Sequence, residues 1–500
     1  LMVDDLQSRM ISGESTARSI AEAYLHRIAA LDKRGPAVNA IIELNPDALY
    51  IADALDQERK VNGPRGPLHG IPVLIKDNID TGDKMQTTAG SLALVGPPAL
   101  RDSFVAKRLR DAGAVILGKT NLSEWANMRS SQSVSGWSGR GGLTRSPYAL
   151  DRNACGSSTG SGVAASGNLC ALAVGPETDG SITCPSSISG LVGIKPTLGL
   201  ISRSGIVPIA HSQDTAGPMA RTVRDAAILL GALAGIDPED RATLSSSGKA
   251  QADYTPYLKP DGLRGARLGV ARKFFGFHPG VDRLMEATLK ELARLGAVLV
   301  DPADVPTAGK FDNTELTVLL YELKADMNSY LARRGPDAPV KSLADIIAFN
   351  QKHADKELLY FGQDSMIKAQ AKGPLTDKAY LNALARNHKL SREDGIDAVM
   401  KTHQLDALIA PTGGPAWTID LVLGDHGVGG GTTTPAAVAG YPHITVPAGE
   451  VFGLPVGLSF FGTAYSEPTL LRLAYSFEQA IHARKPPQFL PTLPLRTMPE

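Results

Sequence analysis

The chain has no excess of either charge and no long apolar run. Its 51 Lys and Arg residues are balanced by 51 Asp and Glu residues, which gives a formal net charge of +0. Proteins that bind nucleic acid carry a basic surface that neutralises phosphates, so this balance predicts no nucleic-acid partner. A helix that spans a bilayer needs roughly 20 consecutive apolar residues, and no run in this sequence approaches that length. We therefore expect no membrane insertion.

Cysteine is also scarce, since only Cys155, Cys170 and Cys184 occur. An odd count without the spacing of metal ligands predicts neither a disulfide framework nor a zinc site. The sequence begins at Leu1, so a signal peptide could have been trimmed before this residue. A cytoplasmic and an exported location therefore both stay open.

What the chain does have is the composition of a folded globular protein. Hydrophobic residues make up 43% and charged residues 20%, and both fractions lie near globular averages. A length of 500 residues is only a soft guide to domain number, because large α/β enzymes often form one unit. We expect one large core with additions.

Two serines, each beside glycine, mark the stretch from Cys155 to Pro196. Ser157 and Ser181 are 24 residues apart, and apolar segments such as Leu169 to Val174 lie between them. A flexible Gly/Ser linker lacks such segments. The two hydroxyls form a pair if the intervening chain is a helix and a strand that return to their start. Serine is a nucleophile once a base takes its proton, and glycine lets backbone N–H groups approach a carbonyl. The stretch therefore predicts an active site, with an oxyanion hole in residues 178–181.

The base for this chemistry is not decided by spacing. The stretch contains no histidine, whereas Lys76 ends the apolar strand predicted at residues 71–78, where burial would lower its pKa. Lys119 and Lys195 also lie beside glycine or proline, and spacing alone does not choose among the three. The ordinary alternatives are an edge lysine that discourages aggregation and serines that cap helices or form turns.

Apolar periodicity predicts alternating strands and helices with helical additions. The strand at 71–78 is followed by a helix at 103–111 and a second strand at 114–117. Charged helical patterns occupy about 237–406, for example 315–331 and 343–359, and we expect these helices to form a wall over the site. The remaining predicted elements are helices near 15–31, 46–55, 226–233 and 469–480, and strands at 405–411, 443–446 and 454–461.

Residues 113–120 match the phosphate-loop pattern GxxxxGK[ST]. A phosphate loop requires a strand before its first glycine and an open loop between the glycines. Here the apolar segment Ala114 to Leu117 fills that interval. We therefore reject a nucleotide site.

A second nucleophile reading exists within the same stretch. Gly156 to Gly160 fits GxSxG with Ser158 as the nucleophile. An elbow of this kind follows an apolar strand, whereas Asp-Arg-Asn at 151–153 precedes this one. It would also need a late histidine such as His443 and an acid such as Asp406. We keep it as the weaker alternative.

Seven ordered motifs nearly span the chain: HGIPVLIKDNI, GKTNLSEWAN, CGSSTGSG, ETDGSITCP, GLVGIKPT, SQDTAGPMAR and GLPVGLSFFG. With them the sequence resembles the amidase signature family, and within it most closely the peptide amidases. The resemblance implies one α/β domain over residues 1–500, with a mixed central β-sheet flanked by helices. Its catalytic core would cover about 65–235 and 405–480, and its peripheral substrate-shaping region about 237–406.

The same resemblance implies a Ser-cisSer-Lys triad that needs neither cofactor nor metal. By motif, Lys76 is the base, Ser157 the bridging serine with a cis peptide, and Ser181 the nucleophile that forms an acyl-enzyme. The backbone of Thr178, Asp179, Gly180 and Ser181 would form the oxyanion hole. The expected partner is a small-molecule or peptide amide, and the expected state is a monomer or homodimer.

Two departures from the family pattern bear on the substrate. Pro176 stands where the family usually has threonine, and Thr183 stands where many members have an arginine suited to carboxylates. Neutral amides such as peptide C-terminal amides are therefore expected, with acyl anilides and carbamates as alternatives. An amidotransferase A-type subunit is a further alternative, and a catalytically dead binding protein is disfavoured by intact Lys76, Ser157 and Ser181.

Overall fold

A computed structural model describes residues 1–427 and 429–494 of the chain. Its centre is an 11-stranded sheet that contains both parallel and antiparallel neighbours. In spatial order the strands are β1 (Ile41–Leu44), β3 (Val115–Thr120), β2 (Pro72–Lys76), β6 (Leu172–Glu177), β8 (Thr215–Ala220), β7 (Val192–Lys195), β12 (His443–Val451), β13 (Leu454–Phe461), β11 (Ala407–Pro411), β9 (Arg267–Val270) and β10 (Val298–Val300). The predicted mixed sheet flanked by helices is confirmed.

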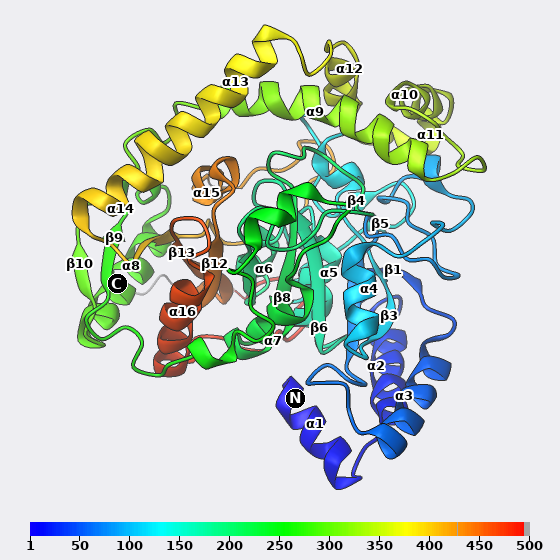
Figure 1. Cartoon of the computed structure of the whole chain (residues 1–500), viewed down its shortest axis with the longest axis horizontal. Coiled ribbons are helices and arrows are strands. Elements are labelled where there is room, and N and C mark those ends of the chain that lie inside the picture. The colour runs from blue at the N-terminus through cyan, green and yellow to red at the C-terminus, as the bar shows by residue number, and fades with distance from the viewer. Residues whose placement is uncertain (428, 495–500) are drawn as a thin grey trace.

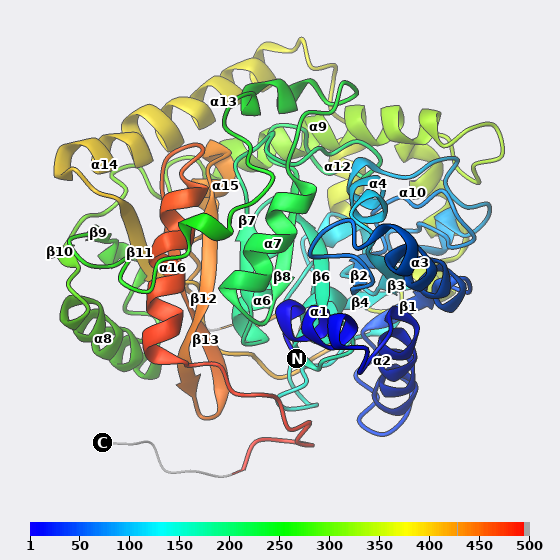
Figure 2. The ribbon, with the colours of Figure 1, turned by 60° about the horizontal axis from the view of Figure 1, so that its bottom comes forward.

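Helices cover the sheet and extend beyond one end of it (Figure 1). They are α1 (Val3–Ser12), α2 (Ala17–Leu31), α3 (Ala48–Asn62), α4 (Phe104–Asp111), α5 (Thr159–Ser166), α6 (Thr183–Ile188), α7 (Val223–Leu233), α8 (Pro279–Arg294), α9 (Asp312–Arg333), α10 (Leu343–Lys352), α11 (Ala354–Glu357), α12 (Asp364–Gln370), α13 (Lys378–His388), α14 (Asp397–His403), α15 (Thr433–Ala439) and α16 (Glu467–Ile481). Figure 2 shows α7 and α16 lying across one face of the strands. A short hairpin of β4 (Trp137–Ser138) and β5 (Gly142–Leu143) stands apart from the main sheet.

Strand β2 is the buried strand that the sequence predicts at residues 71–78. All five of its residues are buried, and it runs parallel to β3 on one side and to β6 on the other. Strands covered on both faces are apolar throughout, as Val73 to Ile75 are. Because the carboxyl ends of parallel neighbours lie at the same edge of a sheet, Lys76 meets the loop that follows β6.

The region at 237–406 contributes more than peripheral helices. Strands β9 and β10 come from it and form one edge of the main sheet. There β9 pairs in parallel with β10 on one side and with β11 on the other. The helix pattern predicted at 343–359 is divided at His353 into α10 and α11. The charged patterns therefore located the helices, whereas the short segments Arg267–Val270 and Val298–Val300 gave no comparable strand pattern.

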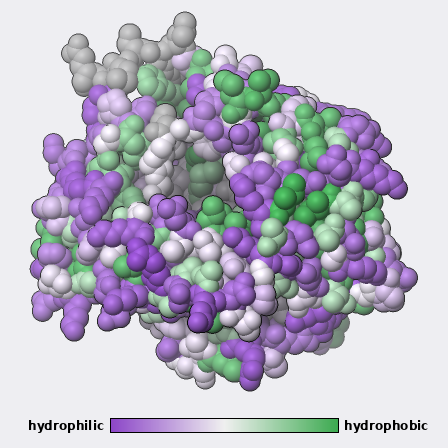
Figure 3. Space-filling model, turned by 90° about the horizontal axis from the view of Figure 1, so that it is seen from above, coloured by the Kyte–Doolittle hydropathy of each residue, from purple (hydrophilic) through white to green (hydrophobic). Residues whose placement is uncertain are grey.

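The remaining helices of this region form an arch above the sheet. Figure 1 shows α9 and α13 along the top of the molecule and α14 below α13 at its left side, and α9 and α13 also lie at the top in Figure 2. Apolar side chains on α9 attach the arch to the core, because Leu323, Met327 and Leu331 belong to one buried cluster with Leu122 and Trp125. Seen from this side, the surface is hollowed and mostly hydrophilic around the hollow (Figure 3).

No helix within the described part of the chain combines the length and apolar character that crossing a membrane requires. The longest helix, α9, carries charged residues along its length.

Candidate active site

Lys76 and the two predicted serines lie together in the structure. The Lys76 Nζ donates a hydrogen bond to Ser157 Oγ at 2.7 Å, and Ser157 Oγ lies 2.9 Å from Ser181 Oγ. Lys76 and Ser157 are fully buried, and Ser181 is 7% exposed. A continuous chain of three polar groups therefore runs from the end of β2 to the loop after β6.

The chain between the serines follows the predicted return path. Helix α5 begins at Thr159, β6 brings the chain back, and the Ser158 N–H donates to the Ser181 carbonyl at 3.1 Å. The peptide bond between Gly156 and Ser157 is cis. Local helix and strand formation therefore brings residues 24 positions apart into contact.

The environment of Lys76 disfavours its charged form. Burial lowers the pKa of Lys76 from 10.5 to about 7, although the negative charges of Asp214 and Glu177 act in the opposite direction. Desolvation of a cation is costly unless a carboxylate binds it, and the side-chain hydrogen bond of Lys76 goes to a hydroxyl. A substantial fraction of Lys76 is therefore neutral near pH 7.

Glu177 organises the loop that carries Ser181; it opens the motif ETDGSITCP, but no role was predicted for it from the sequence. Its buried carboxylate accepts hydrogen bonds from the N–H groups of Gly180 at 2.8 Å, Ile182 at 2.7 Å and Thr183 at 2.9 Å. The Thr183 hydroxyl also donates to it at 3.2 Å. An acidic residue at the end of the apolar strand Leu172–Pro176 was the available signal. Thr183, one of the two departures from the family pattern, thus helps to hold this loop.

Asp214, in the motif SQDTAGPMAR, is a second residue for which no role was predicted from the sequence. Its carboxylate accepts hydrogen bonds from the Thr178 hydroxyl at 2.6 Å and from the N–H groups of Ile209 and Ala210. Burial raises the pKa of Asp214 to about 6, and these hydrogen bonds partly offset the rise. Asp214 therefore ties the loop before β8 to the residues that precede Ser181.

The four predicted oxyanion residues form one short loop between β6 and α6. The Asp179 carboxylate accepts hydrogen bonds from the hydroxyls of Thr433 and Thr434. The Gly180 N–H is already engaged by Glu177. Gly180 has a φ of 85°, in the region that favours glycine.

A cavity of about 820 Å³ opens onto the three polar groups. Its wall includes Lys76, Ser157 and Ser181, together with Pro176 and Thr178. Helix α9 supplies another part of the wall through Asp326, Ser329, Tyr330 and Arg333. The cavity has the size of a typical small-molecule site, and the predicted helical wall over the site is present.

The alternative lysines do not reach the serines. Lys119 Nζ donates to the carbonyls of Ile79 and Gln86 and to the Thr87 hydroxyl. Lys119 belongs to β3, which fills the interval that a phosphate loop would need. Lys195 Nζ instead faces the Ala436 carbonyl at 3.4 Å.

The structure does not bring together the residues of the GxSxG alternative either. Ser158 Oγ donates to the Pro176 carbonyl at 3.0 Å, and His443 Nε2 lies 2.6 Å from Ser459 Oγ. Asp406 accepts a hydrogen bond from the Arg267 N–H. The three residues that this reading requires are thus engaged at three different places.

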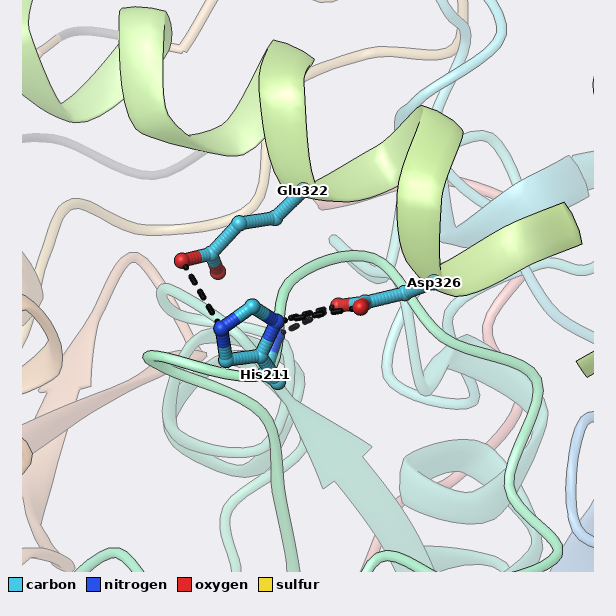
Figure 4. Close-up of side chains that lie close together, drawn as sticks. All are labelled: His211, Glu322 and Asp326. Atoms are coloured by element: carbon cyan, nitrogen blue, oxygen red, sulfur yellow. Dashed lines mark hydrogen bonds and ion pairs between the residues drawn. The ribbon is translucent and has the colours of Figure 1, made fainter. Parts of the chain in front are cut away.

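One group of metal-ligand type occurs within the described residues: His211, Glu322 and Asp326 (Figure 4). His211 and Asp326 line the cavity. The His211 ring is placed between two carboxylates of α9, with Nδ1 2.9 Å from Asp326 and Nε2 3.3 Å from Glu322. A metal ion takes one ring nitrogen of a histidine, whereas here each nitrogen faces its own carboxylate. The arrangement is that of an imidazole bridging two acids.

The prediction that the cysteines form no disulfide framework is wrong, because Cys155 and Cys184 form a disulfide. Their Cα atoms are 6.1 Å apart although 29 residues separate them in sequence. The return of α5 and β6 produces this proximity, which a cysteine count cannot detect. Cys170 is the free, buried third cysteine.

Comparisons with known proteins identify the family of the chain. A family model described as Amidase matches residues 19–471. The chain is 52% identical to the native peptide amidase from Stenotrophomonas maltophilia, over 98% of each of the two chains, and superimposes on it with a TM-score of 0.93. It is 41% identical to a probable amidase of Arabidopsis thaliana, over 98% of this chain and 91% of the relative. It is also 35% identical to the A-type subunit of the glutamyl-tRNA(Gln) amidotransferase of Thermosynechococcus vestitus, over 97% of this chain and 99% of the relative.

A family match across most of the sequence and the fold shared with a peptide amidase lead to one conclusion. The chain belongs to the amidase signature family and is an amide hydrolase.

Proposed function

We propose that this amidase hydrolyses neutral amides, such as peptide C-terminal amides, through an acyl-enzyme formed on Ser181. The observation that carries the proposal is the buried contact chain from Lys76 Nζ through Ser157 Oγ to Ser181 Oγ, at 2.7 and 2.9 Å. A weak serine nucleophile needs a base within hydrogen-bond reach, and this chain provides one through a second hydroxyl.

In the proposed mechanism, neutral Lys76 accepts a proton from Ser157 while Ser157 accepts the proton of Ser181. Hydroxyl hydrogens rotate freely, so the two contacts can carry the proton in this direction. Ser181 Oγ attacks the amide carbonyl carbon, the C–N bond breaks, and the leaving nitrogen receives the proton by the reverse route. Water then attacks the ester with the same base, which releases the acid and restores Ser181.

The oxyanion would bind to backbone N–H groups of Thr178, Asp179, Gly180 and Ser181. Donors aimed at a developing oxyanion typically contribute about 3 to 4 kcal/mol each to transition-state stabilisation. Because the Gly180 N–H already donates to Glu177, we expect the other three residues to provide the principal donors. Glu177 would hold the loop in shape for them.

The neutral-substrate proposal rests on the loop and on the cavity. Thr183 is turned towards Glu177 and offers no cation to a substrate carboxylate. The cavity of about 820 Å³ has room for a short peptide amide. The 52% identity to a peptide amidase favours this class over acyl anilides and carbamates, which the same chemistry could also cleave.

The identity to an amidotransferase A-type subunit supports a second candidate function. A protein of that type would pass ammonia to its partners, whereas we propose that this chain acts alone, as a monomer or homodimer without a nucleic-acid partner. Hydrolysis of simple amides by the purified chain would favour our proposal.

The Cys155–Cys184 disulfide favours the exported location, because disulfides persist in oxidising compartments.

The test combines two serine variants with a substrate panel of peptide amides, acyl anilides, short aliphatic amides and carbamates. Ser181→Ala should lower kcat for the best substrate by at least about 10⁴-fold, since residual activity without the nucleophile is small. Ser158→Ala should retain most of the activity. If Ser158→Ala were the inactive variant and Ser181→Ala the active one, the elbow reading would replace ours.

A further inference from the structure

We propose that the Cys155–Cys184 disulfide is a positioning crosslink for the two serines, and that a dithiol reductant lowers turnover reversibly by opening it. This inference rests on the proposed roles of Ser157 and Ser181. It adds a residue pair that does not touch the substrate and a chemical means of control.

The crosslink joins the two segments that carry the serines. Cys155 lies two residues before Ser157, and Cys184 lies three residues after Ser181. The hydrogen bond from the Ser158 N–H to the Ser181 carbonyl, at 3.1 Å, joins the same two segments on the other side of Ser157. One covalent and one non-covalent connection therefore flank the contact of 2.9 Å between the serine hydroxyls.

Each cysteine also makes one backbone N–H hydrogen bond, and both of these bonds stay within the cysteine's own segment. The Cys155 N–H donates to Asn153 Oδ1 at 2.8 Å, and the Cys184 N–H donates to the Gly180 carbonyl at 2.8 Å. Cys155 has a φ of 57°, a conformation that residues with a Cβ atom rarely adopt. Loss of the crosslink would let this segment relax, and the relaxation would move Ser157 relative to Ser181.

A reductant can reach the disulfide without entering the catalytic cavity. Both cysteines line a second cavity of about 380 Å³, together with Gly180, Ile188 and Trp417. Cys155 is 8% exposed and Cys184 is half-buried. Cys170 differs from them, because it is fully buried and burial raises the pKa of its thiol to about 12.

The chemistry is a thiol–disulfide exchange with a dithiol as the reductant. A thiolate of the dithiol attacks Sγ of Cys184, the bond between the two protein sulfurs breaks, and Cys155 leaves as a thiolate. The second thiolate of the reductant then displaces Cys184 and closes a cyclic disulfide. Two electrons pass from the reductant to the protein, and the two protein thiolates take up the two protons that the reductant lost.

The experiment treats the folded protein with dithiothreitol, blocks new thiols with iodoacetamide and counts the labels by mass spectrometry. Two labels are expected, on Cys155 and Cys184. Unblocked reduced protein should show kcat lowered at least fivefold with KM changed less than twofold, and its far-UV circular dichroism should be unchanged. Removal of the reductant in air should restore kcat without refolding.

Two variants and one control separate positioning from general stability. Cys155→Ser and Cys184→Ser should each show the lowered kcat and no further response to dithiothreitol. Cys170→Ser should keep the wild-type kcat and the wild-type response. The pH midpoint of kcat should change little in all of them, because burial is the main cause of the lowered pKa of Lys76 and Lys76 stays buried in β2.

Complete double labelling with an unchanged kcat would overturn the inference. A loss of kcat that runs in parallel with loss of circular dichroism would also overturn it, since the disulfide would then act on stability alone. Failure of the proposed function would look different, because Ser181→Ala would then retain activity whatever the state of the cysteines.

Discussion

Among the buried lysines at this end of the sheet, Lys76 differs from Lys119 in the number of its hydrogen-bond acceptors. Lys119 Nζ contacts two carbonyls and a hydroxyl, which together solvate an ammonium group. Within the described part of the chain, the side chain of Lys76 makes one hydrogen bond, from Nζ to the Ser157 hydroxyl. A lysine that has lost water and gained one neutral partner is the better proton acceptor.

This environment predicts the pH dependence of the enzyme. Because burial lowers the pKa of Lys76 to about 7, protonation below that pH would remove the base that we propose. The value of kcat/KM should therefore rise with pH through a midpoint near 7 and reach a plateau above it. Lys76→Ala should lower kcat by about 10²- to 10⁴-fold, the usual contribution of a general base, and should lose this rise.

A pH–rate profile of the wild type and of Lys76→Ala, with a peptide amide as substrate, tests whether Lys76 is the base. Lys195→Ala provides the comparison, because Lys195 is also buried with a pKa lowered to about 8 but faces the Ala436 carbonyl. The rise should survive in Lys195→Ala. A full rise in Lys76→Ala would show that another group is the base.

At the scale of elements, α9 is attached to the loop before β8 through polar contacts as well as apolar packing. Glu322 accepts hydrogen bonds from the Ser212 N–H at 2.9 Å and from the Tyr380 hydroxyl at 2.6 Å. The His211 ring lies between Glu322 and Asp326 (Figure 4). The same loop carries Asp214, so α9 is connected to the residues around Ser181.

The histidine makes this attachment pH-dependent. Burial alone would lower the pKa of His211, but the hydrogen bond and charge of Asp326 and the charge of Glu322 raise it overall, against a smaller opposing effect of Arg203. A histidine whose folded pKa is raised stabilises the fold below its unfolded pKa of about 6.5. That stabilisation is lost as the pH rises through the folded value.

Amide hydrogen exchange should detect this loss. Protection factors in the part of α9 around Glu322 and Asp326 should fall severalfold between pH 6 and pH 8. His211→Gln should show low protection at both pH values. His426→Gln should behave like the wild type, because His426 is also exposed but contacts Thr418 and Gly424 instead of α9. Equal protection at both pH values in the wild type would rule out the imidazolium as the connecting charge.

At the scale of the whole molecule, a buried arginine fastens the helical arch to the core. Arg129 and its two acidic neighbours, Glu124 and Glu357, are fully buried. Arg129 also donates to the carbonyls of Phe361 at 3.0 Å and Gly362 at 3.1 Å. Its guanidinium lies 3.9 Å from the centroid of the Phe361 ring. The loop after β3 and the segment between α11 and α12 therefore share one charge network.

Arg129→Met should lower the free energy of unfolding by about 3 to 5 kcal/mol, because removal of one partner leaves buried carboxyl groups uncompensated. Burial already raises the pKa of Glu124, and Arg129 acts against this rise. Arg294→Met, which breaks an exposed ion pair with Glu291 at 2.7 Å, should cost less than about 1 kcal/mol. Urea unfolding followed by fluorescence measures both values, and equal costs would contradict the network's role.

Much of the fold could be predicted because its elements have strong local patterns. The apolar run before Lys76 produced a strand buried on both faces, and the charged helical pattern at 315–331 produced α9. Strands β9 and β10 escaped prediction, since each has only three or four residues and both lie in the region 237–406, where charged helical patterns dominate.

The sequence by itself, through its resemblance to the amidase signature family, selected the residues that we propose carry the chemistry. The motifs around Lys76, Ser157 and Ser181 selected one lysine and two serines, and local helix and strand propensities then made the two serine segments return to each other. Only the tertiary structure decided the rest: the lowered pKa of Lys76, the part played by Glu177 and Asp214, and the Cys155–Cys184 disulfide. Each of these depends on burial or on contact between distant segments, which local sequence does not encode.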